Sequence, residues 1–194
     1  MNIMQNAPAA SSIDALAADY AARTGARAVE PFHFQTSPSP LFPDEEPELE
    51  EGSITLRLQG RTREEIIDEL MGTAARSPKL VDADAAREAV LRRERLAGSG
   101  WHNGVAIPHG RTEAVRDLVA VFGVSEAAVD FQADDGRPCR IFLLSLAPSR
   151  RAGAQLSFVA RIESRLRDRA VREAVLDARS GREVLKALSI PSAS

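Results

Sequence analysis

Two short apolar runs constrain the fold of this 194-residue chain more than any other feature. Residues 118–124 read Leu-Val-Ala-Val-Phe-Gly-Val, and residues 139–146 read Cys-Arg-Ile-Phe-Leu-Leu-Ser-Leu. Apolar runs of this length, bounded by turn-forming residues, are typical of buried strands. Between them, residues 134–138 read Asp-Asp-Gly-Arg-Pro, which has the composition of a turn. The two runs therefore predict the centre of a covered sheet.

Helical patterns flank these strands in the sequence. Thr62 and Glu65 have the spacing of a capping box, and apolar residues follow at helical period as far as Ala74. Further helices are expected over residues 84–96, 155–167, 168–178 and 180–188. Residues 54–58 alternate between apolar and polar side chains, as a half-buried strand does. Strands interleaved with helices predict an α/β domain with helices on both faces of one sheet.

The first part of the chain has a different composition. Its prolines are concentrated at Pro31, Pro38, Pro40, Pro43 and Pro47, and they lead into an acidic run over residues 44–51. Prolines at this density prevent a helix or a central strand, and the acidic residues repel one another. We therefore predict an N-terminal extension with a Pro-rich acidic tether over residues 1–52, followed by a folded domain over residues 53–190.

Charge and cysteine content exclude several classes of function. The formal net charge of −3 gives no basis for binding to nucleic acid or to an anionic membrane. The single cysteine, Cys139, lies within an apolar run and is interpreted as a core residue, so no intramolecular disulfide is expected. The sequence has no apolar run of membrane-spanning length and no signal-peptide pattern. These features predict a cytoplasmic protein without direct membrane insertion.

The leading candidate for chemistry is His109, in the segment Gly-Val-Ala-Ile-Pro-His-Gly-Arg at residues 104–111. Pro108 favours an extended conformation at Ile107, and Gly110 permits a sharp turn or the close approach of a ligand. We therefore expect a strand that ends abruptly and displays the imidazole at its tip. A neutral imidazole can accept a phosphoryl or acyl group. A histidine that only hydrogen-bonds a loop would fit the same pattern equally well.

Arg93 is a second candidate. It follows Val90 by three residues and Ala89 by four on the inward stripe of the 84–96 helix. A guanidinium at the end of an apolar stripe is expected to face a cleft or an anion. The charged residues on either side of Arg93 fit a surface salt bridge as well, and on this evidence alone that simpler interpretation is preferred.

The glycine-rich segment 98–104 contains Ser99 and Asn103, whose side chains and backbone N–H groups are candidates to support phosphate oxygens. A plain surface loop also explains this segment. It lacks the Walker lysine and the dinucleotide glycine pattern, so we expect no nucleotide cofactor. His102 precedes His109 by seven residues, but no cysteine or suitably spaced carboxylate accompanies them, so no metal is expected either.

Gln155 begins the predicted 155–167 helix on its apolar face. A polar group in that position is expected either to face a site or to be a partly exposed residue of the first turn. The pattern alone favours the second interpretation.

Together these segments resemble the EIIA domain of the fructose/mannitol class of the bacterial phosphotransferase system, including the nitrogen-related regulatory EIIA proteins. The resemblance covers about residues 53–190. It is carried by the segments 93–94, 98–110, 129–138 and 141–148, which occur in the family's order and spacing. It implies a three-layer α/β sandwich with a mixed central sheet and helices on both faces.

The resemblance also implies a function. His109 would accept a phosphoryl group from an HPr-like phosphocarrier, and Arg93 would face the phosphorylated histidine. The partner downstream would be a separate EIIB domain or a regulatory target protein, and no cofactor is implied. A degenerate EIIA fold that binds a partner without phosphoryl transfer stays open as an alternative.

The sequence departs from the family pattern near the site. The family usually has a second histidine where this chain has Gln155, whose amide can donate to a phosphate oxygen but cannot take a positive charge. Ser99 replaces the usual threonine and keeps its hydroxyl. Trp101 and His102 replace a small apolar residue and a glycine. The glutamine and the N-terminal extension slightly favour a regulatory output over sugar transport.

Overall fold

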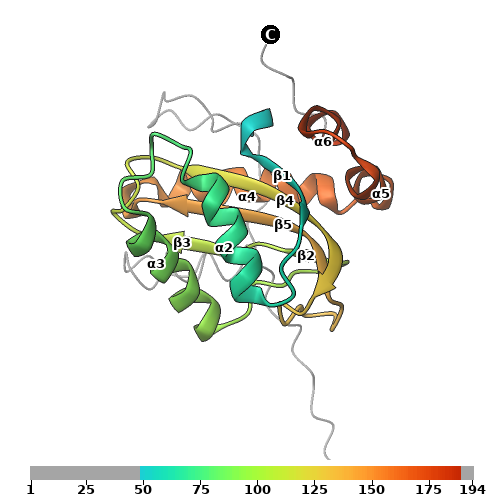
Figure 1. Ribbon diagram of the computed structural model, residues 1–194, viewed down its shortest axis with the longest axis horizontal. Coiled ribbons are helices and arrows are strands. Elements are labelled where there is room, and N and C mark those ends of the chain that lie inside the picture. The colour runs from blue at the N-terminus through green and yellow to red at the C-terminus, as the bar shows by residue number, and fades with distance from the viewer. Residues whose placement is uncertain (1–48, 189–194) are drawn as a thin grey trace, which may run out of the picture.

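The computed structural model describes residues 49–188, and a mixed sheet forms the centre of this part of the chain (Figure 1). Its strands are β1 (Ile54–Leu58), β2 (Val105–Ala106), β3 (His109–Arg111), β4 (Val119–Val129) and β5 (Cys139–Ala147). They lie in the order β1-β4-β5-β2, and β3 also pairs with β5. The β4–β5 pair is antiparallel, whereas β1 is parallel to β4 and both β2 and β3 are parallel to β5.

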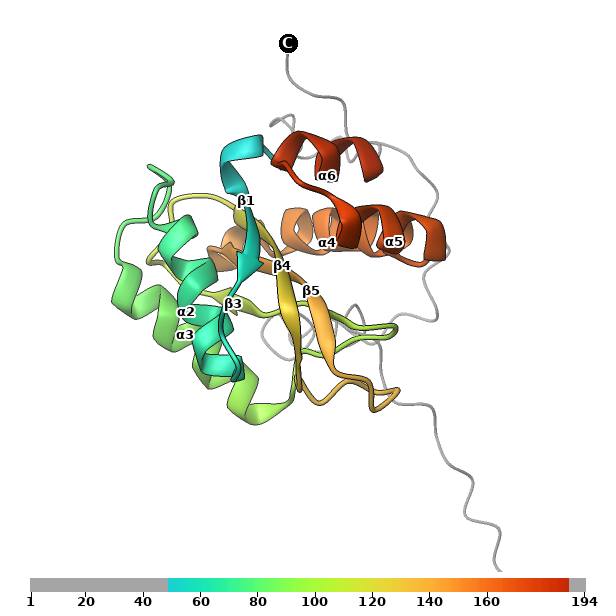
Figure 2. The ribbon, with the colours of Figure 1, turned by 45° about the vertical axis from the view of Figure 1, so that its right-hand side comes forward.

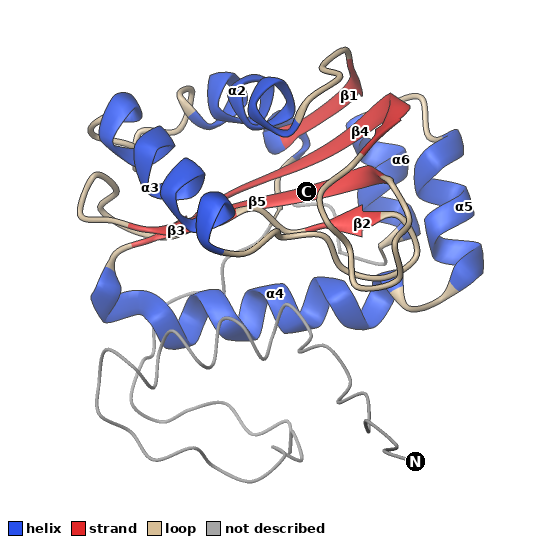
Figure 3. Ribbon diagram, turned by 90° about the horizontal axis from the view of Figure 1, so that it is seen from below, coloured by secondary structure: helices blue, strands red, loops and turns tan. Residues whose placement is uncertain are grey.

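Helices cover both faces of the sheet, which confirms the predicted three-layer α/β architecture (Figure 3). One face carries α2 (Arg63–Ala74) and α3 (Ala83–Leu96), and the other carries α4 (Ala152–Leu166). Two shorter helices, α5 (Arg169–Asp177) and α6 (Gly181–Ala187), follow α4, and α6 lies beside the start of β1 (Figure 2). Short 3₁₀ turns, η1 (Glu51–Ser53) and η2 (Ser149–Arg151), precede β1 and α4.

Local capping explains where several helices begin. Thr62 and Glu65 form the predicted capping box at the start of α2, because each side chain accepts a hydrogen bond from the backbone N–H of the other. The Asp82 carboxylate caps α3, and the Ser180 hydroxyl caps α6. These contacts satisfy backbone N–H groups that have no partner within their own helix.

Alternation along β5 divides the core into two apolar clusters. Phe142, Leu144 and Leu146 belong to the cluster under α2 and α3. Ile141, Leu143 and Ala147 belong to the cluster under α4. Since successive strand residues point to opposite faces, Ser145 must point toward α4.

The α4 cluster includes Leu49, which is 3% exposed and precedes the predicted domain boundary. Residues 1–48, which make up most of the predicted extension, lie outside the described residues. The division of the chain at residue 52 therefore stays a prediction.

The expected geometry of the His109 segment is wrong. His109 does not end a strand. It begins β3, after a break at Ile107 and Pro108 that separates β3 from β2. Proline has no N–H to donate, but its carbonyl accepts a hydrogen bond from the Ser145 N–H at 3.0 Å, so pairing with β5 resumes directly after it. His109 is only 3% exposed and is therefore buried rather than displayed at a tip.

Candidate active site

The His109 imidazole has a defined orientation. Its Nδ1 lies 2.9 Å from the carbonyl oxygen of Ile107. A carbonyl oxygen can only accept, so this contact requires the proton to be on Nδ1. In a neutral imidazole with that tautomer, the lone pair is on Nε2, which is the nitrogen able to act as a nucleophile.

Strand β3 presents its side chains to two different layers. A Cβ atom added to Gly110 would lie 3.1 Å from Val90 Cγ2 and 3.2 Å from the Val90 backbone N, so position 110 faces α3. His109 and Arg111 alternate with it and must point to the opposite face, toward α4. His109 also pairs in register with Ser145, which points the same way.

Gln155, on α4, connects the side chains on this face. Its Nε2 donates to the carbonyl oxygen and the hydroxyl of Ser145, both at 3.2 Å. Its Oε1 accepts from Arg111 Nε at 3.4 Å. Gln155 and Ser145 are fully buried, and Arg111 is 7% exposed. The structure therefore groups His109, Arg111, Ser145 and Gln155 into one polar cluster between the sheet and α4, which we call the His109 cluster.

Sequence reasoning missed Arg111 and Ser145. The signal for Arg111 was its position two residues after His109, which places both side chains on one face if the segment is a strand. The signal was not used because the strand was expected to end at His109. Ser145 carried no local signal, since its place opposite His109 depends on the register between β3 and β5.

Gln155 lies near His109, but its amide is oriented differently from the expectation. Its N–H groups point to the two oxygens of Ser145, and its carbonyl oxygen faces the guanidinium of Arg111. It is buried within α4 rather than partly exposed at the first residue of that helix. The orientation follows from the acceptors and the donor that surround the amide.

The structure places Arg93 on α3, which packs against the other face of the sheet from α4 (Figure 3). Its side chain is partly exposed, and Nη1 donates to the carbonyl oxygen of Ala97 at 2.9 Å. This bond satisfies a carbonyl at the C-terminal end of the helix. The arginine that shares a strand face with His109 is thus Arg111, and the facing role predicted for Arg93 stays a prediction.

Ser99 lies close to the histidine strand, in a hairpin rather than in a flexible loop. Its carbonyl accepts from the Ile107 N–H at 2.8 Å, and Gly100 bridges to Ala106. The Ser99 N–H donates to the Glu94 carboxylate at 3.1 Å. Burial raises the pKa of Glu94, against the opposing effects of this hydrogen bond and of Arg63.

Four backbone N–H groups of the segment that was expected to cradle phosphate are bonded within the protein. Ser99, Gly100, Trp101 and Asn103 each donate the backbone N–H to an acceptor within the protein. These groups therefore stabilise the hairpin. The role of the Ser99 hydroxyl toward phosphate stays a prediction.

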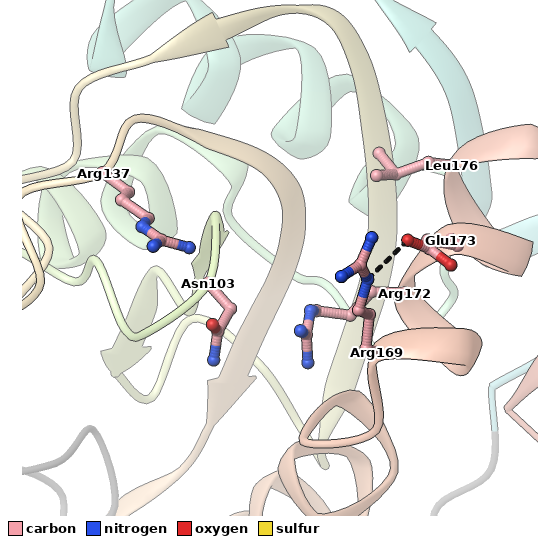
Figure 4. A pocket seen from close by; sticks show the side chains of 6 residues that line it. All are labelled: Asn103, Arg137, Arg169, Arg172, Glu173 and Leu176. Atoms are coloured by element: carbon pink, nitrogen blue, oxygen red, sulfur yellow. Dashed lines mark hydrogen bonds and ion pairs between the residues drawn. The ribbon is translucent and has the colours of Figure 1, made fainter.

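Asn103 lies at the tip of the hairpin, away from His109. Val105 pairs with Ile141, whereas His109 pairs with Ser145, and four residues of strand span about 13 Å. Asn103 is exposed and lines a separate cavity of about 370 Å³ with the side chains of Arg137, Arg169, Arg172, Glu173 and Leu176 (Figure 4). The structure does not bring Asn103 into the His109 cluster.

Within residues 49–188, no group of three or more histidine, cysteine, aspartate or glutamate side chains is arranged to hold a metal ion. In the same part of the chain, no helix has the length and apolar character needed to cross a membrane.

Comparison with known proteins gives the family. Residues 48–190 match the family model for the phosphoenolpyruvate-dependent sugar phosphotransferase system, EIIA 2. The chain belongs to this family. The EIIA domain is similar to the fructose-specific EIIA component of Haloferax volcanii, with 32% identity over 136 residues that cover 70% of this chain and 88% of that protein. It is 30% identical over 132 residues to the fructose-specific EIIABC component of Bacillus subtilis, covering 68% of this chain but only 21% of the longer protein.

Solved structures agree with this assignment. The crystal structure of the nitrogen regulatory protein IIA-Ntr from Neisseria meningitidis superposes with a TM-score of 0.66 and 25% identity, covering 71% of this chain and 94% of that one. The mannitol EIIA of Escherichia coli, solved in complex with phosphorylated mannitol EIIB, has a TM-score of 0.63 at 24% identity and covers 73% of this EIIA chain and 97% of its own. The similarity to the mannitol EIIA concerns the fold alone.

Proposed function

We propose that this EIIA domain accepts a phosphoryl group on Nε2 of His109 from an HPr-like phosphocarrier. The observation that carries the proposal is the 2.9 Å contact between His109 Nδ1 and the Ile107 carbonyl. It fixes the ring and leaves the nucleophilic lone pair on the other nitrogen. Membership of the EIIA family supports phosphoryl transfer as the reaction.

The transfer balances without a cofactor. In the donor, a protonated phosphohistidine, the P–N bond breaks and the carrier's imidazole leaves as a neutral ring with its own proton. The new bond joins phosphorus to His109 Nε2, while the proton stays on Nδ1, which continues to donate it in a hydrogen bond to the Ile107 carbonyl. The acceptor becomes a phosphoimidazolium, so the carbonyl dipole of Ile107 stabilises the positive charge that develops on the ring.

Two outputs follow from the relatives. The fructose-specific components support onward transfer to a separate EIIB domain, as does the complex that the mannitol EIIA forms with phosphorylated EIIB. The nitrogen regulatory protein supports a second output, in which phosphorylation of His109 controls binding to a target protein. The alternative is an EIIA fold that binds a partner without any phosphoryl transfer.

The test is labelling from phosphoenolpyruvate through enzyme I and HPr. We expect acid-labile phosphate on the wild type and none on His109→Ala. The matched control is His102→Ala, which removes a partly exposed histidine seven residues away and should leave labelling intact. A folded wild type that takes no label would favour the binding-only alternative.

A second step separates the two outputs. Labelled wild type is mixed with the purified EIIB domain from the same genome. Loss of label from EIIA, with its appearance on EIIB, would support the transport output. Label that stays on EIIA, with a phosphorylation-dependent change in binding to a target protein, would support the regulatory output.

A further inference from the structure

We propose that Arg111 binds the phosphoryl group that His109 accepts. This proposal rests on the proposed function of His109 as the phosphoryl acceptor. It assigns the charge-stabilising role to a residue two positions along the same strand.

The placement of the two side chains on β3 supports this role. His109 and Arg111 are the first and third residues of β3, so their side chains leave the strand on the same face. Gly110 between them faces α3, which fixes the other two toward α4. Residues two apart on a strand face are separated by about 7 Å at Cα, a distance that an arginine side chain and a phosphoryl group together can bridge.

The charge of the phosphoryl group also requires a cation nearby. A phosphorylated imidazole brings a group of charge about −2 into a site where His109 is 3% exposed. Burying such a charge is costly unless a cation or several donors accompany it. Arg111 is also buried, at 7% exposure, and its planar guanidinium can donate two parallel hydrogen bonds to phosphate oxygens.

Gln155 holds the Arg111 side chain on this face of the sheet. Gln155 Oε1 accepts from Arg111 Nε, and the Gln155 amide is itself held by both oxygens of Ser145. Gln155 is neutral, so it orients the guanidinium without neutralising its charge. The bond to Gln155 uses Nε, so it leaves the two terminal nitrogens of the guanidinium as the donors that would face a phosphate oxygen.

The test compares initial rates of His109 phosphorylation from HPr-phosphate in the wild type, Arg111→Gln and Arg111→Lys. Loss of one preorganised donor typically slows a reaction about 100-fold, and we expect a loss of this size for Arg111→Gln. Arg111→Lys keeps the positive charge but cannot donate two parallel hydrogen bonds, so it should be phosphorylated faster than Arg111→Gln and more slowly than the wild type. The matched control is Arg169→Gln. The Arg169 side chain is 84% exposed and lines the separate cavity beside Asn103, so this variant should be phosphorylated at the wild-type rate.

A second readout separates this proposal from the proposed function. Phosphoramidate phosphorylates histidine without a protein carrier, because its P–N bond breaks and ammonia leaves as the P–Nε2 bond forms. Phosphate on His109 is counted as the label that His109→Ala lacks, and thermal melting confirms that each variant is folded.

Each outcome decides something. If phosphoramidate labels the wild type and HPr-phosphate does not, the proposal of an HPr-like donor is overturned. If Arg111→Gln is then labelled by phosphoramidate more slowly than the wild type, the role of Arg111 is supported. Equal rates for wild type and Arg111→Gln with both donors would overturn the role of Arg111 and leave the acceptor function standing. No phosphate on wild-type His109 with either donor would overturn both.

Discussion

Arg111 Nε and Gln155 Oε1 lie 3.4 Å apart, and this contact joins the strand that carries His109 to the helix that covers it. The two residues are 44 positions apart in sequence, and both are at least nine-tenths buried. Because Ser145 holds the other end of the Gln155 amide, three elements meet at one side chain: β3, β5 and α4. A change at any of these positions therefore reaches the surroundings of His109 without touching the imidazole.

Gln155→His introduces the histidine that the family usually has at this position. The introduced imidazole would lie beside a buried guanidinium, and like charges at close range disfavour its protonated form. We expect it to stay neutral at pH 7 and the rate of His109 phosphorylation not to rise. Transfer from HPr-phosphate, measured for Gln155→His and for Gln155→His combined with Arg111→Ala, checks this. A faster single variant would contradict it.

Gly110→Ala should damage both stability and transfer. The added methyl would lie 3.1 to 3.3 Å from Val90 and Leu146, including the backbone of α3, so β3 or α3 must move. Overpacking of this kind costs about 1–3 kcal/mol. Urea denaturation measures the loss of free energy of unfolding, and labelling from HPr-phosphate should slow because His109 precedes this residue.

The matched control is Gly72→Ala, in the exposed part of α2, where an added methyl meets nothing within 4 Å. Alanine is a better helix former than glycine, so this variant should gain about 0.5–1 kcal/mol. If Gly110→Ala were as stable as the wild type, the close packing of β3 against α3 would be disproved.

Sequence reasoning recovered the parts of the fold that local physics decides. The capping box of Thr62 and Glu65 and the apolar period after it predicted α2, and the two apolar runs predicted β4 and β5. The end of α5 and the start of α6 also fell within a residue or two of the prediction. In each of these cases the signal lies within a few residues of the element it describes.

The parts that failed depend on pairing between distant segments. The break between β2 and β3 is decided by where β5 resumes hydrogen bonding after Pro108, and no local pattern records that. The same register places Ser145 opposite His109, and the docking of α4 brings Gln155 to Arg111. His109 could be proposed as the candidate residue from the sequence because its flanking proline and glycine are local signals.

Cys139 should be inert in the folded protein. Burial, with smaller contributions from nearby carboxylates, raises the pKa of its thiol to about 12, and the thiol donates to the Val105 carbonyl. Since only the thiolate reacts, alkylation by iodoacetamide at pH 8 should be about 1000-fold slower than for an unperturbed cysteine. Mass spectrometry of timed samples, with and without urea, measures this.

The control for Cys139 is a variant in which Cys139→Ala removes the buried thiol and Arg169→Cys supplies an exposed one on α5. It should react at the ordinary rate in both conditions. Rapid alkylation of the wild type without urea would mean that the first residues of β5 open readily.

Glu94 should make stability depend on pH in a defined direction. Burial raises the pKa of this carboxyl, so between its unfolded and folded pKa values the folded protein binds more protons than the unfolded chain. The contribution of Glu94 to stability is therefore greatest below the unfolded pKa and is lost as the pH rises through the folded pKa. Glu94→Gln keeps an oxygen acceptor for the Ser99 N–H and removes the titration.

Urea denaturation of wild type and Glu94→Gln at pH 7 and pH 5 measures this difference. We expect the wild type to gain stability relative to Glu94→Gln on acidification, because protonation removes the cost of the buried charge. Glu88→Gln changes an exposed carboxylate on the same helix, and its free energy of unfolding should change between the two pH values as that of the wild type does. If the wild type instead loses stability relative to Glu94→Gln as the pH falls, the interactions of Glu94 with Arg63 and with the Ser99 N–H outweigh the effect of burial and keep the carboxylate ionised.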